Sequence, residues 1–456
     1  MNIQFFLTGW LLSIVFLSLI RLKWAVALFV AYLMLVPYIN LGIPGFGSGD
    51  NLIKLILVFG FFLEHRKQHT LKVSFKPYVP FIFYFSISLI MIPFQSSVPM
   101  GEMIDAWRKD VMNILLLPIV MYNLMRTDPS SVKLFRNTMI VCIFIAIGYG
   151  LFLTLLGGIN PYIMYFLTLI DTEIDYEAYY DASGGGRLFG RISSVFIHPM
   201  TFALFIGLAF LYVFYIMKKI WKVVSITLFT AIGVMAVLCG VRSVIGGLAV
   251  AAIYYFVIGR NYRLMFGSIL IGLIGMFVIT FIPDLSDYLA SIVDINNESG
   301  SVRGSSIEMR MNQLEGAIDE ALANPLFGLG YGWTTYYQNM YGEHPICLCF
   351  ESLLFVVICN SGIIGLLLWA YMIWRFMVTN YKLRLKQVVI VNALIVFYIS
   401  YSFITGEYAY MKIFLVFYTL MLGESIEMIL VPSPKNTKLI DNSSDYLLSM
   451  DRNSKS

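Results

Sequence analysis

Residues 194–217 read SVFIHPMTFALFIGLAFLYVFYIM, a run without lysine, arginine, aspartate or glutamate. The hydrocarbon core of a bilayer is ~30 Å thick, and an α-helix of about 20 apolar residues crosses it. Such a helix also satisfies all its backbone polar groups within the segment, which lipid requires. This run therefore predicts a transmembrane helix.

Similar apolar runs recur along the rest of the chain. They lie near residues 3–20, 24–43, 51–63, 78–94, 110–125, 137–158, 223–241, 243–258, 264–283, 350–378, 387–405 and 408–430. The total is thirteen spans, or twelve and one partial crossing, because the run at 51–63 is short and contains Lys54. Only 13% of the residues are charged, against roughly 25% in soluble domains. We predict an all-α fold, a polytopic transmembrane helix bundle.

The basic residues predict the orientation of this bundle. Of the 31 lysines and arginines, 22 lie in the tail after residue 430 and in alternate loops at 21–23, 64–76, 126–136, 218–222, 259–263 and 375–386. An excess of Lys and Arg is typical of cytoplasmic loops. The opposite side, which contains most of the acidic residues and two long loops, is therefore expected to be external.

These assignments divide the chain into six regions. They are N-terminal transmembrane helices (1–158), a first external loop (159–193), central transmembrane helices (194–283), a large external loop with an amphipathic helix (284–349), C-terminal transmembrane helices (350–430) and a cytoplasmic tail expected to be disordered (431–456). Long loops on one face of a rigid scaffold commonly contain the functional site. We therefore expect the site on the external face.

Familiar signals of soluble enzymes are absent from the sequence. It contains no GxxxxGK[ST], HExxH or GxSxG motif. The five cysteines fall in apolar stretches and form no CxxC pair, so neither a zinc site nor a disulfide framework is expected. The net charge of +4 is too mild to predict a nucleic-acid partner.

Arginine on the predicted external side is the feature that indicates chemistry. Membrane proteins disfavour basic residues there, yet the external segments contain Arg187, Arg191, Arg242, Arg303 and Arg310. A guanidinium has a permanent charge and a planar fork that matches phosphate oxygens. Clustered arginines of this kind therefore predict a site for a pyrophosphate.

Arg310 lies in a segment with the periodicity of an amphipathic helix. Ser305 and Glu308 form a capping box at its start. The apolar face is expected to comprise Ile307, Met311, Leu314, Ala317, Ile318, Ala321 and Leu322. Arg310 is the only charged residue within that face. It either extends to a lipid phosphate or points into a binding site.

Three ionisable side chains near the external membrane edge are candidate bases. Glu351 lies in the apolar run CLCFESLLFVV, where it is either the counter-ion of an arginine or a base that accepts a proton. His344 closes the large loop and is the alternative base. His198 begins the span at 194–217, and we expect it to be structural.

Four stretches occur in a characteristic order. They are GRISSVFIHPMTFALF (190–205), GVRSVIGGL (240–248), MRMNQLEGAIDEALANPLFGLGYG (309–332) and ESLLFVVICNSGIIGLLLW (351–369). Together they resemble the O-antigen polymerase and O-antigen ligase superfamily of bacterial envelopes. The resemblance covers about the C-terminal 60% of the chain, whereas residues 1–180 match only as generic membrane spans.

The resemblance implies a glycosyltransferase that takes glycans from undecaprenyl pyrophosphate at the periplasmic face of the bacterial inner membrane. It implies inversion at the anomeric carbon and no metal or other cofactor. By analogy, Arg191, Arg242 and Arg310 bind the pyrophosphate, together with the neighbouring Arg187. The implied partners are the lipid-linked glycan donor and acceptor, the bilayer and a chain-length regulator.

One position distinguishes the two activities of this superfamily. Ligases usually show histidine eleven residues before the first glycine of the GIIG-like pair, where this chain has Glu351. His344 lies seven residues earlier. This departure favours a polymerase over a ligase. A flippase of lipid-linked glycans is a further alternative, but it needs a polar path, and the spans contain few charged residues.

Overall fold

The computed structural model describes the chain in nine segments. They are residues 3–37, 49–67, 73–157, 159–170, 191–267, 307–383, 385, 387–405 and 410–430. Within these segments the regular secondary structure is helical, and an isolated bridge between His344 and Leu348 is the sole extended pairing. The prediction of an all-α fold is confirmed.

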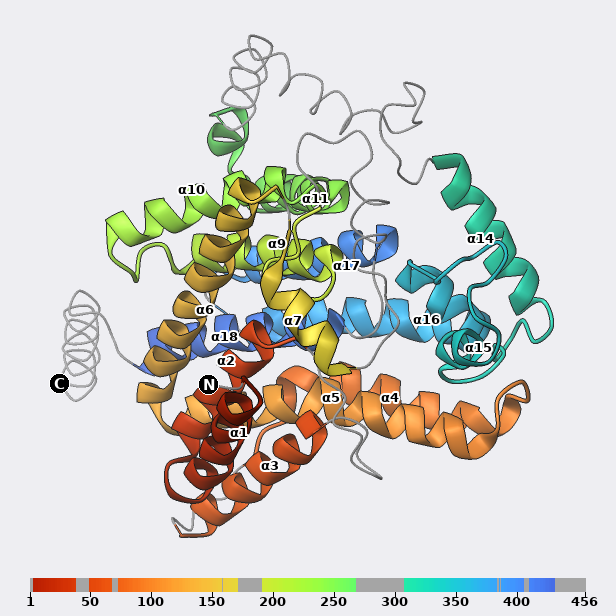
Figure 1. Ribbon diagram of the computed structural model, residues 1–456, viewed down its shortest axis with the longest axis horizontal. Coiled ribbons are helices and arrows are strands. Elements are labelled where there is room, and N and C mark those ends of the chain that lie inside the picture. Colours follow the sequence, from red (N-terminus) through yellow and green to blue (C-terminus); the bar gives the residue numbers. More distant parts are fainter. Residues whose placement is uncertain are drawn as a thin grey trace, which may run out of the picture.

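Figure 1 shows the helices of the described segments. They are α1 (Ile3–Ile20), α2 (Leu22–Leu35), α3 (Gly49–Lys67), α4 (Val79–Met91), α5 (Met100–Thr127), α6 (Pro129–Leu155), α7 (Pro161–Ile170), α9 (Pro199–Ile216), α10 (Lys222–Leu238), α11 (Arg242–Ile258), α14 (Ile307–Ala321), α15 (Trp333–Tyr341), α16 (Leu353–Lys382), α17 (Val388–Ile404) and α18 (Tyr410–Leu430). Two 3-10 turns flank α4, namely η1 (Lys76–Tyr78) and η2 (Ile92–Phe94).

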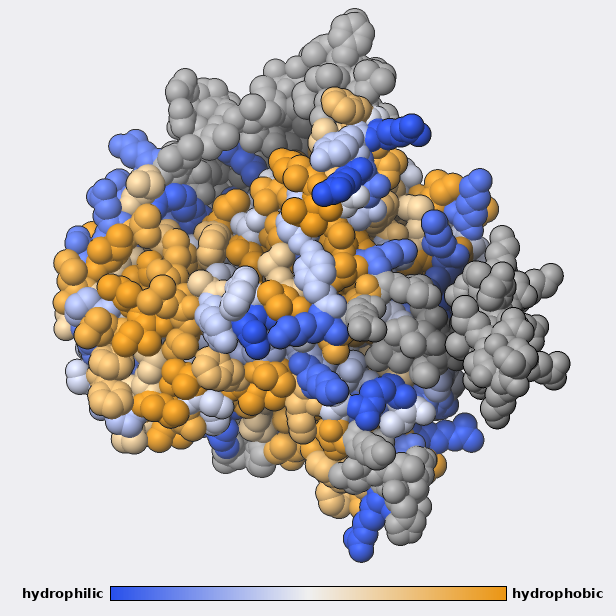
Figure 2. Space-filling model, turned by 180° about the vertical axis from the view of Figure 1, so that it is seen from behind, coloured by the Kyte–Doolittle hydropathy of each residue, from blue (hydrophilic) through white to orange (hydrophobic). Residues whose placement is uncertain are grey.

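Several of these helices have the length and composition of membrane spans. Four described segments are long and apolar enough to cross a bilayer, namely Lys76–Phe94, Pro129–Leu155, Pro199–Ile216 and Leu353–Lys382. Five shorter apolar helices accompany them in the described part of the chain. Large apolar side chains such as Phe144 and Leu367 are exposed, and Figure 2 shows apolar side chains over much of one face. A polytopic helical bundle is confirmed, whereas the number of 12–13 spans stays a prediction.

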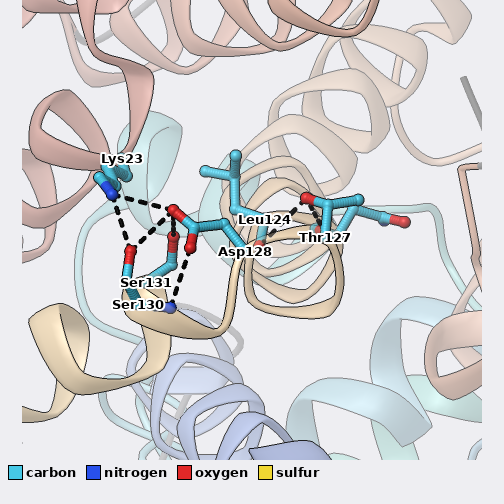
Figure 3. A network of polar contacts seen from close by, with 7 residues as sticks. Lys23, Leu124, Thr127, Asp128, Ser130 and Ser131 are labelled. Carbon is cyan, nitrogen blue, oxygen red and sulfur yellow. Dashed lines mark hydrogen bonds and ion pairs between the residues drawn. The ribbon is translucent and has the colours of Figure 1, made fainter. Parts of the chain in front are cut away.

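The connection between α5 and α6 differs from the expected loop at 126–136. The two helices are separated by Asp128 alone. Its Oδ1 accepts a hydrogen bond from the Ser130 amide at 2.9 Å and so caps α6. Lys23 Nζ donates to Asp128 Oδ2 at 2.9 Å and to Ser130 Oγ at 2.7 Å (Figure 3). The polar residues that suggested a loop are therefore the cap and first turn of a helix.

A second hydrophobic core lies outside the main core of the bundle. It joins the ends of α4 and α5 to α14, α15 and the start of α16 through residues that include Val98, Ala317, Trp333 and Phe350. Figure 1 shows α14 and α15 together at one edge of the molecule, beside the start of α16. Helix α15 was not expected, because the large loop at 284–349 was predicted to contain one amphipathic helix, which is α14. This external core positions the candidate site.

Helix α16 is broken at Gly362, which has φ 59° and ψ −158°. The break leaves backbone groups without their partners along the helix, and the loop before α15 satisfies them. The Leu329 amide donates to Cys359 O at 2.8 Å, and the Ile363 amide donates to Pro325 O at 2.9 Å. The segments NPLFGLGYG and GIIG, which are distant in sequence, are thus in direct backbone contact.

Glycine and glutamine make this close approach possible. A Cβ on Gly328 would lie 2.4 Å from the Ser361 amide nitrogen, and its φ of +77° also favours glycine. The buried Gln95 donates from Nε2 to Phe327 O at 2.6 Å and to Asn360 O at 3.0 Å. One side chain therefore links the loop to the broken helix.

Candidate functional site

An ion pair between α14 and the start of α16 is the centre of the candidate site. Arg310 Nη2 lies 2.7 Å from Glu351 Oε2, and Arg310 Nη1 donates to Gln313 Oε1 at 2.8 Å. The Arg310 and Glu351 side chains are 20% and 34% exposed. The Nε of Arg310 is buried and has no hydrogen-bond partner among the described residues. Arg310 therefore points into the protein, as one of the two sequence interpretations had it, and keeps one donor unused.

The buried face of α14 differs from the predicted apolar arc. The buried residues are Gln313, Gly316, Ala317 and Ala321. Exposed members of the predicted arc are Met311, Ile318 and Leu322. Small side chains let α14 pack closely on α16, and the hydrogen bond to Arg310 makes burial of Gln313 tolerable. The expected register of the helix was therefore partly wrong, although Arg310 lies on the protein side.

His198 connects this ion pair to the segment before α9. It is the N-cap residue of α9, and its ring is exposed at the surface. The pKa of His198 is lowered, mainly because desolvation by the surrounding protein disfavours the charged imidazolium. The negative charge of Glu351 acts against this shift, and the positive charge of Arg191 adds to it. Both residues must lie close enough to interact with the imidazole. His198 thus marks a place where Arg191 and the Arg310–Glu351 pair approach each other.

The segment that carries Arg191 is held in an unusual conformation. Asn160 Nδ2 donates to Ser193 Oγ at 3.0 Å and to Ser194 O at 2.6 Å. Ser194 has φ 51°, a left-handed conformation that a non-glycine residue rarely adopts. The Nε of Arg191 is buried without a hydrogen-bond partner among the described residues. Asn160 therefore positions a second arginine that has an unused donor.

Arg242 begins α11 in the same corner of the molecule. It precedes Ser243, and Tyr401 of α17 interacts with both Ser243 and Arg191. The Tyr401 hydroxyl also donates to Met200 O at 2.6 Å in the first turn of α9. The starts of α9 and α11 are therefore neighbours, and the structure brings Arg191 and Arg242 to one region.

Three helices begin in this corner, namely α9, α11 and α16. Ser352 caps α16 by accepting from the Leu354 amide at 3.2 Å, and its hydroxyl donates to Phe403 O at 2.6 Å in α17. The amino-terminal end of a helix has a partial positive charge and unpaired N–H groups. Three such ends and three arginines make this corner suitable for an anion.

His344 has a different environment from Glu351. It is buried, and its Nδ1 accepts hydrogen bonds from the Ile346 and Cys347 amides at 3.2 and 2.9 Å. The neutral ring therefore has its proton on Nε2, which lies 3.2 Å from Glu320 Oε1. Both ring nitrogens stabilise the turn that leads to α16. This geometry favours a structural role for His344.

Strained backbone precedes Glu351. Leu348 and Phe350 have φ of 52° and 50°, although neither is glycine. Residues in this region cost about 1–3 kcal/mol each and cluster at functional sites. The strain sets the position of Glu351 just before the N-cap of α16.

A cavity of about 650 Å³ with a mixed polar and apolar lining adjoins this strained turn. Its wall includes Cys349 and Phe350, and residues of α5 and α15 complete it. A volume of this size lies in the range of small-molecule sites. The cavity and the Arg310–Glu351 pair lie on the two sides of one short segment.

The structure shows where the residues predicted from the sequence lie, and their roles stay predictions. Arg191, Arg242, Arg310 and Glu351 are found together, whereas Arg187 lies outside the described residues. Asn160, Gln313 and Gln95 were missed. Each is a buried side-chain amide that hydrogen-bonds to another segment or side chain of the site. Burial of an amide depends on tertiary packing, so no local sequence pattern marks these residues.

Comparison with known families gives one match. Residues 226–370, about a third of the chain, match the family model described as O-antigen ligase. The matched region contains Arg242, Arg310, His344 and Glu351. No curated protein matches the chain. The family match agrees with the resemblance seen in the four sequence stretches and, with the apolar helices, indicates a multi-pass bacterial membrane protein.

Proposed function

We propose that this membrane protein, of which residues 226–370 match the O-antigen ligase family model, polymerises lipid-linked oligosaccharide repeat units. The donor is a glycan on undecaprenyl pyrophosphate, and the acceptor is the sugar end of a second lipid-linked repeat unit. The reaction takes place at the periplasmic face of the inner membrane. The observation that supports this best is the arginine-rich corner around Glu351, which combines anion-binding groups with a carboxylate.

The bond changes assign a role to each group. The acceptor hydroxyl attacks the anomeric carbon, its proton passes to the Glu351 carboxylate, and the bond from that carbon to the pyrophosphate oxygen breaks. Attack from the opposite side inverts the anomeric configuration. Negative charge develops on the leaving pyrophosphate, and preorganised guanidinium groups stabilise it without a rearrangement at the moment of reaction. Arg191, Arg242 and Arg310 supply these groups, with no metal or nucleotide in the scheme.

The ion pair suggests how substrate binding prepares the base. Arg310 lies against Glu351, and its Nη2 occupies the carboxylate oxygen Oε2 at 2.7 Å. A bound pyrophosphate attracts Arg310 and also offers an acceptor to its unused Nε. Glu351 then loses part of its cationic neighbour just when the donor is present. The carboxylate oxygen is then open to the acceptor hydroxyl when the donor is bound.

Deletion of the gene in the host tests the proposal. Glycans from the deletion strain and from the complemented strain are compared by chain length on gels. A polymerase predicts glycans limited to one repeat unit in the deletion strain and long chains after complementation. Repeat units trapped on the cytoplasmic side would instead indicate a flippase and would contradict the proposal.

Ligation to lipid A core is the second candidate function. The description of the matched family as O-antigen ligase favours it, whereas glutamate at position 351 favours polymerisation. In the same deletion strain, a ligase predicts long lipid-linked chains together with uncapped lipid A core. The two activities therefore give opposite chain lengths in one experiment.

A further inference from the structure

The cavity between α5 and α15 has a chemistry that the arginine-rich corner does not explain. Helix α5 contributes Glu102, Asp105 and Asp110 to its wall. Helix α15 contributes Thr335, Gln338 and Asn339. Spacings of three, four and five residues put the members of each set on or near one helix face. A wall of carboxylates therefore faces a wall of hydroxyl and amide groups.

The polar groups of α15 are available for a ligand. The side chains of Thr335, Gln338 and Asn339 make no hydrogen bond to any described residue. Amide groups offer both donors and acceptors. Glu102 on the opposite wall likewise has no ion-pair partner in the described part of the chain. Such a combination matches the hydroxyl groups of a saccharide, each of which donates and accepts.

The carboxylates also set the charge of the cavity. Three acidic residues line it, with Lys109 as the single cation of the wall. Burial tends to raise the pKa of Asp105, but the contacts with Lys109 and Arg108, each at 2.5 Å, outweigh it and lower that pKa. Asp105 therefore stays ionised near neutral pH. An acidic sugar would meet an excess of negative charge.

The cavity has a fixed position relative to the reacting groups. The Tyr331 hydroxyl donates to Asp110 Oδ2 at 2.8 Å, so the loop before α15 is tied to α5. Cys349, an exposed residue of the wall, interacts electrostatically with Glu351. A glycan bound in the cavity could extend along residues 349–351 to the carboxylate of Glu351. The cavity is therefore adjacent to the segment that carries Glu351.

We propose that this cavity binds the saccharide part of the substrate and selects uncharged or amino sugars over acidic ones. The inference rests on the proposed glycosyltransferase function and adds the class of sugar and the place where it binds. The α15 amides and the α5 carboxylates hydrogen-bond the sugar hydroxyls. The net negative wall excludes uronic acids and other acidic residues from the positions next to the reacting end.

Protection of Cys349 provides a test that does not depend on polymer formation. The purified full-length protein is treated at pH 8.5 with a methanethiosulfonate reagent, and modification of Cys349 is followed by mass spectrometry. Two probes share one backbone, a glucosamine tetrasaccharide that is either N-acetylated, hence neutral, or N-succinylated, hence acidic. We expect the neutral probe to slow the modification and the acidic probe to protect about tenfold more weakly, because like charges repel.

Two variants distinguish the cavity from a general effect of sugar. The double variant Gln338→Ala, Asn339→Ala removes both amides and should abolish protection by the neutral probe. Asn312→Ala removes an exposed amide from α14, away from the cavity, and should leave protection unchanged. Glu102→Gln should narrow the difference between the two probes. Gln338 is partly exposed, and Glu102, Asn312 and Asn339 are exposed. For each variant, a Cys349 labelling rate without probe equal to that of the wild type shows normal folding.

The inference is overturned if the neutral probe gives no protection at millimolar concentration. It is equally overturned if the acidic probe protects as well as the neutral one, or if the double variant is still protected. Those outcomes leave the proposed function intact as long as the deletion strain shows short glycans. Conversely, the neutral probe could protect Cys349 while the gene deletion leaves the glycan chain length unchanged. That result would support the saccharide site and contradict the proposed polymerase function.

Discussion

Two glutamates of this protein each lie beside an arginine, at opposite predicted sides of the membrane. Glu424 pairs with Arg136 Nε at 3.2 Å and with Lys219, and its side chain is 1% exposed. Glu351 pairs with Arg310 and is 34% exposed. The first cluster is enclosed by α6, α18 and the end of α9. The second opens to a surface where strained backbone and helix starts meet.

The difference in enclosure indicates a difference in role. A buried charge that loses its partner costs several kcal/mol, so an enclosed cluster is sensitive to any deletion and holds helices in register. A partly open pair is cheaper to break, and an anion can replace one of its members. We therefore assign the Glu424 cluster to the fold and the Glu351 pair to the reaction.

The largest effect on activity is expected at Glu351. Glu351→Gln keeps the shape but removes the basic carboxylate, and loss of general-base assistance lowers rates by ~10²–10⁴. Polymer in a complemented deletion strain should fall to short chains at an unchanged protein level. His344→Asn is the matched control, because an asparagine oxygen can accept the same backbone amides as Nδ1. If Glu351→Gln polymerises normally and His344→Asn does not, the base is His344.

The opposite pattern is expected at Glu424. Glu424→Ala leaves Arg136 and Lys219 without their carboxylate, and breaking a buried pair costs ~3–5 kcal/mol. The amount of folded protein should drop, as measured by size-exclusion chromatography after heating in detergent. Any protein that remains folded should polymerise at the normal rate. Normal thermal stability of Glu424→Ala would remove the contrast between the two clusters.

Two glycine-to-alanine substitutions test whether the contact between the loop before α15 and the broken helix α16 stabilises the protein. Gly328→Ala puts a Cβ 2.4 Å from the Ser361 amide nitrogen at φ +77°, so we expect a loss of ~1–3 kcal/mol in thermal stability. Gly342→Ala is the control, since it has a similar φ of +81° but no atom within 4 Å of the new Cβ. Equal effects of the two variants would mean that the contact with the broken helix contributes nothing.

The smallest effect concerns the thiol next to Glu351. Burial, together with Glu343 and Glu351, raises the pKa of Cys349 to about 11. A raised pKa means little thiolate at neutral pH, so this exposed thiol should react slowly with maleimide and about tenfold faster per pH unit up to that pKa. Glu343→Gln should lower the pKa and speed the reaction. Rapid labelling of Cys349 at pH 7 would contradict the raised pKa of this thiol.

The contrast between the two clusters was only partly visible in the sequence. Apolar runs predict a helix wherever a segment must satisfy its own backbone in lipid, so the bundle and the boundaries of α1, α11 and α17 followed within a few residues. The external arginines stood out because their position breaks the charge rule. Glu351 was found next to an arginine, as one interpretation expected.

The rest depends on contacts between distant segments. The helix α15 and the break at Gly362 stabilise each other through backbone bonds, which no local pattern encodes. The exposed Met311 and the buried Gln313 depart from the expected face of α14, whereas Ala317 and Ala321 are buried as expected. The saccharide cavity combines α5 with α15, more than 200 residues later in the chain. Hydrophobic periodicity cannot show such a pairing.

The most direct test is a reaction with purified components. The protein in nanodiscs is given undecaprenyl-pyrophosphate-linked repeat units, and released undecaprenyl pyrophosphate is measured beside the length of the glycan. The wild type should release the lipid and extend the glycan. Arg310→Ala should be slower by ~10²–10³. Arg310→Lys should recover only part of the rate, because lysine restores the charge but lacks the bidentate fork. Wild-type rates from Arg310→Ala would contradict the account.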